Sequence, residues 1–160
     1  MRSVTPLKAV LRAAALVVLV VAVAACSRNG TGVGNLAAGS SAPGSQQEFL
    51  VTVGDRVFFE TDSSNLTPTA QQTLDKQAAW LNRYSNYQIL IEGHADERGT
   101  REYNIALGAR RASVVVNYLQ SRGVDSRRIT SKSFGKERPV AICNDISCWS
   151  QNRRAVTVVQ

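Results

Sequence analysis

The stretch EGHADERGTREYNIALGARRASVVVNYL, residues 92–119, joins the end of an apolar strand pattern to a long helix pattern through a charged loop. The strand pattern is the apolar run at residues 89–91, and the loop spans residues 94–99. Apolar side chains at three- and four-residue spacing share one face of the helix: Ile105, Ala112, Val115, Val116 and Leu119. Arg122 and Gly123 should end it, because glycine readily supplies the left-handed C-cap. The stretch predicts a strand, a loop and a helix that packs one face on a core.

Similar patterns on either side complete a domain over residues 48–160. Strands are predicted at residues 49–51, 57–59, 88–92, 129–134 and 155–159. A further helix should begin at Thr67 and Pro68, an N-cap residue followed by proline at the first helical position, and end near residue 84. This order, with a long loop before the last strand, predicts an α/β (α+β) two-layer sandwich. In this β-α-β-α-β-β domain the helices pack on one face of a mixed sheet.

The N-terminus reads as a signal peptide over residues 1–25. Arg2, Lys8 and Arg12 precede an apolar run at residues 13–25, which is too short for a usual transmembrane helix. The run ends in small residues followed by Cys26, an arrangement that resembles the lipobox of bacterial lipoproteins. The resemblance implies cleavage before Cys26 and lipidation of this residue. The alternative is an ordinary cleavage site with an incidental cysteine.

Residues 26–47 are predicted to be the lipidated cysteine and a flexible linker. The segment is rich in Gly, Ser, Ala and Asn and has little apolar bulk to offset its chain entropy. Ser27 follows the cysteine, where lipoproteins retained in the inner membrane commonly carry aspartate, so we expect an outer-membrane location. The formal net charge of +7 includes three basic residues of the leader, and the other basic residues are interleaved with acidic ones. This pattern does not favour nucleic-acid binding.

Two cysteines, Cys143 and Cys148, lie five residues apart in the loop before the last strand. Export would place them in an oxidising compartment, which favours a disulfide. The alternative is a metal pair. Zinc usually takes four ligands, and His94 is the single histidine of the chain, so no metal site is expected.

The central stretch resembles a known family. HADERG (residues 94–99), followed by N-x-x-L-x-x-x-R-A (residues 104–112), is similar to the signature of the OmpA-like peptidoglycan-binding domain. With the lipobox and linker, and with the segments SFGKERP (residues 133–139) and QNRRAV (residues 151–156), the chain resembles the peptidoglycan-associated lipoproteins of that family. Ala95 and Gly108 depart from the Thr and Ser common in the wider domain.

The resemblance implies non-covalent binding of the peptidoglycan stem peptide through diaminopimelate, whose side chain ends in an ammonium and a carboxylate. Asp96 is expected to take the ammonium, and Arg111 the carboxylate through paired hydrogen bonds. The resemblance places four more residues in the same pocket: Thr61, Asp62, Asn104 and Leu107. It also places Arg153 and Arg154 near the pocket, where either a ligand contact or a solvated surface role is open.

The helix spacing supports part of this site independently. Asn104, Leu107 and Arg111 lie at i, i+3 and i+7 and therefore share a stripe of the helix. The alternative is a surface arginine, with Asp96 interacting only with the helix dipole. Because the helix from residue 100 to 111 would span about 16 Å, Asp96 must fold back or the helix must begin later. His94 is expected to be a hydrogen-bonded structural residue.

These observations predict an outer-membrane lipoprotein, with its domain in the periplasm, that tethers the outer membrane to the cell wall. The expected partners are peptidoglycan, the outer membrane through the lipid anchor, and the Tol system proteins TolB (a periplasmic propeller protein) and TolA. The Tol system would link the chain to envelope integrity and to constriction of the outer membrane in cell division. No cofactor is expected.

The alternative function is a peptidoglycan hydrolase, for which Glu92, Asp96 and Glu97 could supply two carboxylates. An arginine-rich loop favours ionised carboxylates over the protonated acid that such an enzyme needs. No Ser-His-Asp, Cys-His or zinc motif is visible either. The sequence therefore predicts a binding protein and not an enzyme.

Overall fold

The computed structural model describes residues 41–160. The predicted signal peptide, Cys26 and residues 27–40 of the predicted linker lie outside the described residues.

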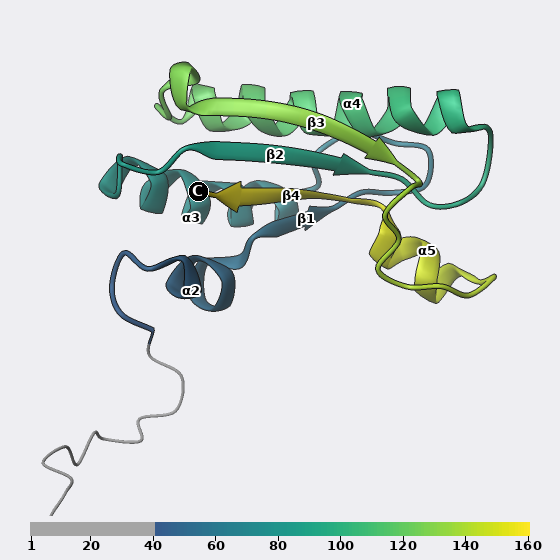
Figure 1. Cartoon of the computed structure of the whole chain (residues 1–160), viewed down its shortest axis with the longest axis horizontal. Coiled ribbons are helices and arrows are strands. Elements are labelled where there is room, and N and C mark those ends of the chain that lie inside the picture. The colour runs from purple at the N-terminus through teal and green to yellow at the C-terminus, as the bar shows by residue number, and fades with distance from the viewer. Residues whose placement is uncertain (1–40) are drawn as a thin grey trace, which may run out of the picture. The chain divides into compact units, whose positions relative to one another are not determined.

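Four strands form one mixed sheet in the order β1-β4-β2-β3 (Figure 1). They are β1 (Arg56–Phe58), β2 (Ile89–His94), β3 (Ile129–Gly135) and β4 (Arg154–Val159). β4 is antiparallel to both β1 and β2, whereas β2 and β3 are parallel. The last strand of the chain therefore lies in the interior of the sheet, which explains its valine-rich sequence.

Two long helices, α3 (Pro68–Arg83) and α4 (Arg101–Ser121), lie on one face of the sheet (Figure 1). Their apolar faces and that of the sheet form one core, which includes Leu74, Ala78, Leu81, Ala112, Val115, Leu119, Ile89, Ile91, Val57, Ala155 and Val159. The predicted two-layer sandwich is confirmed, as is the β-α-β-α-β-β order of its four strands and two long helices.

The predicted helix ends are also confirmed. The Thr67 side chain accepts a hydrogen bond from the Ala70 amide at 3.1 Å, and Pro68 begins α3. Thr100, at which no cap was predicted, caps α4 in the same way, accepting from the Tyr103 amide at 3.2 Å. Gly123 has φ +88°, the left-handed conformation expected just beyond the end of α4.

Two glycines set how closely α4 lies on the sheet. A Cβ atom on Gly93 of β2 would collide with the carbonyl of Gly108 of α4, and one on Gly108 would collide with the Ser133 hydroxyl and the Gly93 carbonyl. Only glycine at both positions permits this approach. Gly108, which departs from the Ser common in the wider family, is therefore required by its neighbours here.

The predicted strand at residues 49–51 is wrong. This segment belongs to a π-helical segment, η2 (Phe49–Gly54), that continues from the short helix α2 (Gln46–Glu48). Phe49 is buried against Trp80, with ring centroids 4.9 Å apart, while Leu50 is half exposed. A three-residue apolar run carries too little periodicity to distinguish a strand from a helical turn.

The end of the predicted linker, residues 41–47, contacts the domain. The Ser45 side chain caps α2, and the Gln46 side chain donates to the Val159 carbonyl at 3.1 Å. The Tyr87 hydroxyl donates to the Gly44 carbonyl at 2.7 Å. Composition predicts flexibility for this segment because it has little apolar bulk. The contacts that hold it to the domain are polar, and composition does not indicate them.

The long loop before β4 contains a helix that the sequence analysis does not predict, α5 (Ile146–Asn152). Asp145 caps it, accepting from the Ser147 amide at 2.7 Å. The remaining short element is a 3₁₀ turn, η3 (Ser126–Arg128), before β3. Of the helices in residues 41–160, none is both long enough and apolar enough to cross a bilayer.

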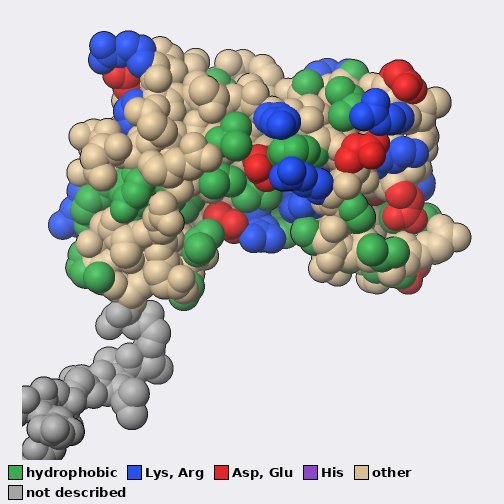
Figure 2. Space-filling view, in the orientation of Figure 1, with side chains coloured by type: hydrophobic (Ala, Val, Ile, Leu, Met, Phe, Trp, Pro, Cys, Tyr) green, Lys and Arg blue, Asp and Glu red, His purple; other side chains and the backbone are tan. Residues whose placement is uncertain are grey.

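The face of the sheet opposite α3 and α4 is turned to the viewer in Figure 2. Lys and Arg side chains lie beside Asp and Glu side chains over the half of this face nearest α5. This view shows no large patch of a single charge sign, as the interleaved sequence predicts.

Candidate ligand-binding site

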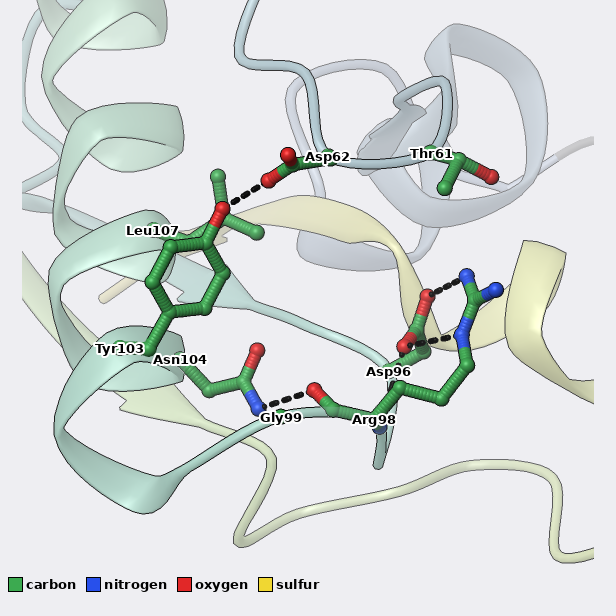
Figure 3. A pocket seen from close by; sticks show the side chains of 8 residues that line it. All are labelled: Thr61, Asp62, Asp96, Arg98, Gly99, Tyr103, Asn104 and Leu107. Carbon is green, nitrogen blue, oxygen red and sulfur yellow. Dashed lines mark hydrogen bonds and ion pairs between the residues drawn. The ribbon is translucent and has the colours of Figure 1, made fainter.

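A hollow of about 280 Å³ lies where the β1–α3 loop, the β2–α4 loop and the start of α4 meet (Figure 3). Its lining residues are Thr61, Asp62, Asp96, Arg98, Gly99, Tyr103, Asn104 and Leu107. Five of the six residues expected to bind a ligand are therefore brought together from three segments. Arg111, the sixth, is not among the lining residues.

Asp96 is held in this hollow by two arginines. Its carboxylate accepts from Arg98 Nε at 3.0 Å and Nη2 at 2.8 Å, from the Arg98 amide at 3.2 Å, and from Arg153 Nη1 at 3.4 Å. Burial alone would raise the pKa of Asp96, but the hydrogen bonds and charge of Arg98, with Arg153, hold its pKa below the ordinary value. Asp96 is therefore an anionic acceptor at neutral pH and not a proton donor.

A second carboxylate, Asp62, lies on the other side of the hollow, where it accepts a hydrogen bond from the Tyr103 hydroxyl (Figure 3). Asp62 is the one residue other than glycine with positive φ, 55°, among residues 41–160. Aspartate tolerates this conformation better than most residues because its side chain can bond locally. The two carboxylates together favour a cationic group between them.

Asn104 and Leu107 support the hollow from α4. The Asn104 side chain is 2% exposed and donates to the Arg98 carbonyl at 2.7 Å, which fixes the loop that carries Asp96. Leu107 is 5% exposed and adds an apolar surface. Their shared stripe on α4, predicted from spacing, therefore faces the site.

Arg111 continues this stripe but is fully buried. Its guanidinium donates to three main-chain carbonyls: Nη1 to His94 at 2.8 Å, Nε to Ser63 at 2.9 Å and Nη2 to Glu60 at 3.2 Å. Burial lowers the pKa of Arg111 to about 10, so it remains charged at neutral pH. The structure places this charge behind the loop that carries Thr61 and Asp62, without exposing it to the hollow.

Asp96 and Arg111 approach each other because the loop between β2 and α4 folds back. α4 begins directly after Thr100 and runs back along β2, so Arg111 reaches the carbonyl of His94, two residues before Asp96. The charge of Asp96 accordingly raises the pKa of Arg111 against the effect of burial. The loop folds back, and a later helix start is not needed.

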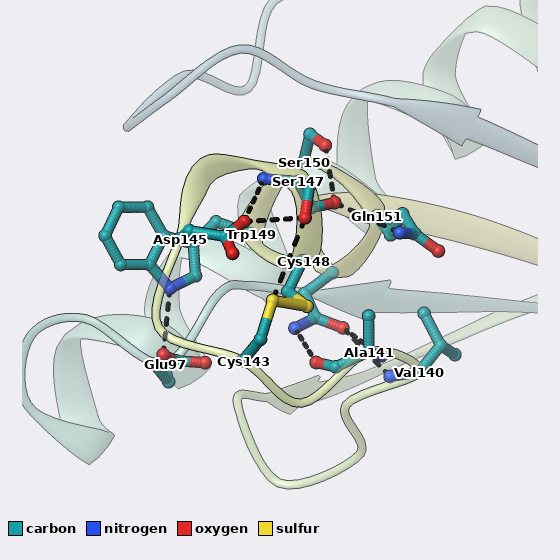
Figure 4. The surroundings of a disulfide bond; sticks show 11 residues. Glu97, Val140, Ala141, Cys143, Asp145, Ser147, Cys148, Trp149, Ser150 and Gln151 are labelled. Atoms are coloured by element: carbon teal, nitrogen blue, oxygen red, sulfur yellow. Dashed lines mark hydrogen bonds between the residues drawn. A yellow bond between two sulfur atoms is a disulfide. The ribbon is translucent and has the colours of Figure 1, made fainter.

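Sequence reasoning missed Arg98 and Tyr103 as site residues and left Arg153 undecided. Arg98 lies over the Trp149 ring at 4.2 Å. The Trp149 indole donates to Glu97 at 2.8 Å, as Figure 4 shows. A short spacing, with Arg98 two residues after Asp96, was the available signal for the ion pair. No local signal pointed to Arg153, because 57 residues separate it from Asp96.

Arg154, by contrast, lies away from the hollow. It is 4% exposed and donates to the carbonyls of Asn152 and Arg138 at 3.4 and 3.2 Å. Both arginines are buried, so neither has the solvated surface role that was left open, and Arg153 is the one next to the site.

His94 has a structural role, but not the expected hydrogen bonds. Its ring is 2% exposed, stacks on Phe134 at 5.5 Å, and neither ring nitrogen has a hydrogen-bond partner among the described residues. Burial, with the charges of Arg154, Arg138 and Arg56, lowers the pKa of His94 to about 4. It is therefore neutral at pH 7 and acts through packing.

Cys143 and Cys148 form a disulfide, with Cα atoms 5.7 Å apart (Figure 4). Among residues 41–160, the one cluster of potential metal ligands is Cys143, Asp145 and Cys148, and both of its sulfur atoms are in the disulfide. The buried Asn152 side chain bonds Val140 and Ala141 of the same loop. Together these contacts fix α5 beside the hollow.

Comparison with known proteins connects this site to a family. Residues 58–153 match the profile of the OmpA family. The chain belongs to the OmpA family. The matched range runs from β1 to the residue before β4 and thus contains the whole hollow, which agrees with the resemblance found in the central stretch.

Named relatives within the OmpA family share most of the chain. A peptidoglycan-associated lipoprotein of Rhizobium meliloti is 66% identical over 124 residues, covering 78% of this chain and 70% of the relative. One of Mesorhizobium japonicum is 56% identical over 147 residues, covering 89% and 88%. The crystal structure of the peptidoglycan-associated lipoprotein from Burkholderia pseudomallei has 40% identity and a TM-score of 0.67, covering 69% of this chain and 96% of that one. These names describe lipoproteins and not enzymes, in agreement with the expected absence of catalysis.

Proposed function

We propose that this member of the OmpA family is an outer-membrane lipoprotein that binds peptidoglycan non-covalently and tethers the outer membrane to the cell wall. The observation that carries the proposal is the hollow in which the anionic Asp96 lies beside two arginines. A site with both charge signs side by side complements a zwitterionic group. The names of the relatives support peptidoglycan as the source of that group.

The proposed ligand is the side-chain end of diaminopimelate in the stem peptide. Its ammonium would bind Asp96, with Asp62 on the facing wall, and its carboxylate would bind Arg98. The ion pair of Asp96 with Arg98 would open, so that each internal charge exchanges its partner for a charge of the ligand. The Arg98 side chain is 41% exposed, so it can turn from Asp96 toward a ligand at the mouth of the hollow.

Arg111 has a supporting part in this proposal. Its hydrogen bonds to the carbonyls of Glu60 and Ser63 hold the turn that presents Thr61 and Asp62. Its buried positive charge, behind the loop that carries Thr61 and Asp62, also attracts the carboxylate of the ligand. Direct donation to that carboxylate would require Arg111 to give up carbonyl partners.

The tether is proposed to begin at a lipid on Cys26 and to continue through residues 27–40. Stable anchoring of this kind requires more than one acyl chain. The domain would then lie in the periplasm, within reach of the wall. As in the family that it resembles, it would work with the Tol proteins TolB and TolA in envelope integrity and in constriction of the outer membrane at division.

Co-sedimentation tests the binding function. The full chain, purified in detergent, should pellet with isolated cell walls, and excess free diaminopimelate should release it. Free lysine, which lacks the second carboxylate, is the matched competitor and should release much less. If the chain stays in the supernatant, the proposed function is wrong. If lysine competes equally well, the site recognises only an ammonium group.

A further inference from the structure

A second hollow, of about 430 Å³, adjoins the first through an ion pair. Its lining residues are Phe58, Phe59, Glu60, Thr67, Ser150, Gln151 and Arg153. Glu60 lines this hollow, and its chain neighbour Thr61 lines the first. Arg153 lines the second hollow, and its partner Asp96, at 3.4 Å, lines the first. The two hollows therefore share the wall formed by Arg153 and Asp96.

Arg153 is held rigidly but keeps free hydrogen-bonding capacity. Its side chain is 6% exposed, its Nε donates to the Phe59 carbonyl at 3.0 Å, and its Nη1 donates to Asp96. Its Nη2 has no hydrogen-bond partner among residues 41–160. This atom is also not one of the fully buried polar atoms without a partner in that part of the chain, so a ligand can reach it. A buried guanidinium with unused donors at the edge of a hollow is suited to an anion.

The other groups of the second hollow fit a peptide. Phe58 and Phe59 offer apolar surface, of which Phe58 is 48% exposed, while Ser150 and Gln151 of α5 add a hydroxyl and an amide. The Glu60 carboxylate is exposed and makes no hydrogen bond or ion pair within the described part of the chain. An extended backbone with one carboxylate could use the apolar surface, the hydroxyl and the amide together, while the Glu60 carboxylate would repel the carboxylate of the ligand.

We infer that the second hollow binds the main-chain carboxylate of a stem peptide that ends in diaminopimelate, with Arg153 as the carboxylate partner. The inference rests on the proposed function, because it assigns to the second hollow the main-chain end of the ligand whose side-chain end occupies the first. Since Arg153 and Asp96 are in contact, a carboxylate on Arg153 and an ammonium on Asp96 can belong to one ligand of amino-acid size. The site would then recognise the C-terminus of the stem peptide as well as its diamino side chain.

Two ligands that differ in a single group test this inference. The probes are a tripeptide ending in diaminopimelate with a free main-chain carboxylate and the same tripeptide with that group as an amide. Isothermal titration of the full chain in detergent should show about tenfold tighter binding of the acid, the size expected for a charge-assisted hydrogen bond. Equal affinities for acid and amide would overturn the inference while leaving the proposed function intact. If neither tripeptide binds, both fail.

Two rim variants add independent readouts. Gln151→Trp should fill the second hollow and lower the affinity for the acid tripeptide to that for the amide. The control, Gln120→Trp, lies at an exposed site in the last turn of α4 and should leave both affinities unchanged. Glu60→Gln removes a like charge and should tighten acid binding about threefold, with the amide within about twofold of wild type. A Gln151→Trp protein that still prefers the acid tenfold would contradict the assignment.

Discussion

The guanidinium of Arg111, in the middle of α4, donates a 2.8 Å hydrogen bond to the carbonyl of His94 at the end of β2. This bond joins the helix to the strand from which the binding loop departs. Two further bonds join the same side chain to the carbonyls of Glu60 and Ser63. One buried arginine therefore fixes both loops that supply carboxylates to the first hollow.

Arg111→Ala is expected to lower the free energy of unfolding by about 3 kcal/mol or more, because it leaves three carbonyls without donors and opens a cavity. Urea unfolding followed by circular dichroism measures this loss. The matched control is Arg110→Ala, at the exposed neighbouring position, which should change stability by less than about 0.5 kcal/mol. Equal, small effects of the two substitutions would contradict the structural role.

His94 should make stability depend on pH. Its folded pKa of about 4 lies below the ordinary value of 6.5, so the unfolded chain binds this proton first and stability falls as pH drops through 6.5 toward 4. From pH 7 to pH 5 the loss from this group is about 2 kcal/mol. Urea titrations at both pH values should show a smaller loss for His94→Leu than for wild type. Identical losses would mean that the imidazole is accessible to protons in the folded state.

Removal of the disulfide should loosen the region of α5. Cys143→Ser combined with Cys148→Ser is expected to lower stability by about 2 kcal/mol, because the cross-link no longer restricts the unfolded chain. Hydrogen exchange should locate the change in α5, which carries Trp149 against Arg98. Wild-type protein under reducing conditions is the control and should behave like the double variant. Unchanged exchange in both would show that Asn152 and its contacts are sufficient.

Much of the fold was accessible from the sequence because its signals are local. Thr67 with Pro68, and Gly123, mark helix ends through their own side chains or φ angles. The four strands and both long helices follow from periodicity. α5 and the α2–η2 segment were missed, since α5 begins at a polar cap, Asp145, and α2, which leads into η2, begins at another, Ser45, in segments without a clear apolar period.

The candidate site was predicted in part for the same reason. Asn104 and Leu107 lie on the predicted stripe of α4, and the loop position of Asp96 follows from the sequence. Arg153 could not be found in this way, because only the placement of β4 inside the sheet brings it to Asp96. The burial of Arg111 likewise depends on how closely Gly93 and Gly108 let α4 approach β2.

Asp96 is the residue on which the binding proposal depends most. Asp96→Asn preserves the shape of the side chain and removes its charge, so the ammonium of the ligand loses its charged partner. Affinity for peptidoglycan should fall about 30-fold, which corresponds to about 2 kcal/mol for a hydrogen bond between charged groups.

The most direct test measures binding of isolated cell walls to the full chain and to two variants, Asp96→Asn and Glu102→Gln. Glu102 is an exposed carboxylate in the first turn of α4 that does not line the hollow, so it controls for a general loss of negative charge. The proposed function predicts that Asp96→Asn loses binding while its far-ultraviolet circular dichroism stays unchanged, and that Glu102→Gln binds like wild type. A folded Asp96→Asn protein that binds cell walls as tightly as wild type would contradict it.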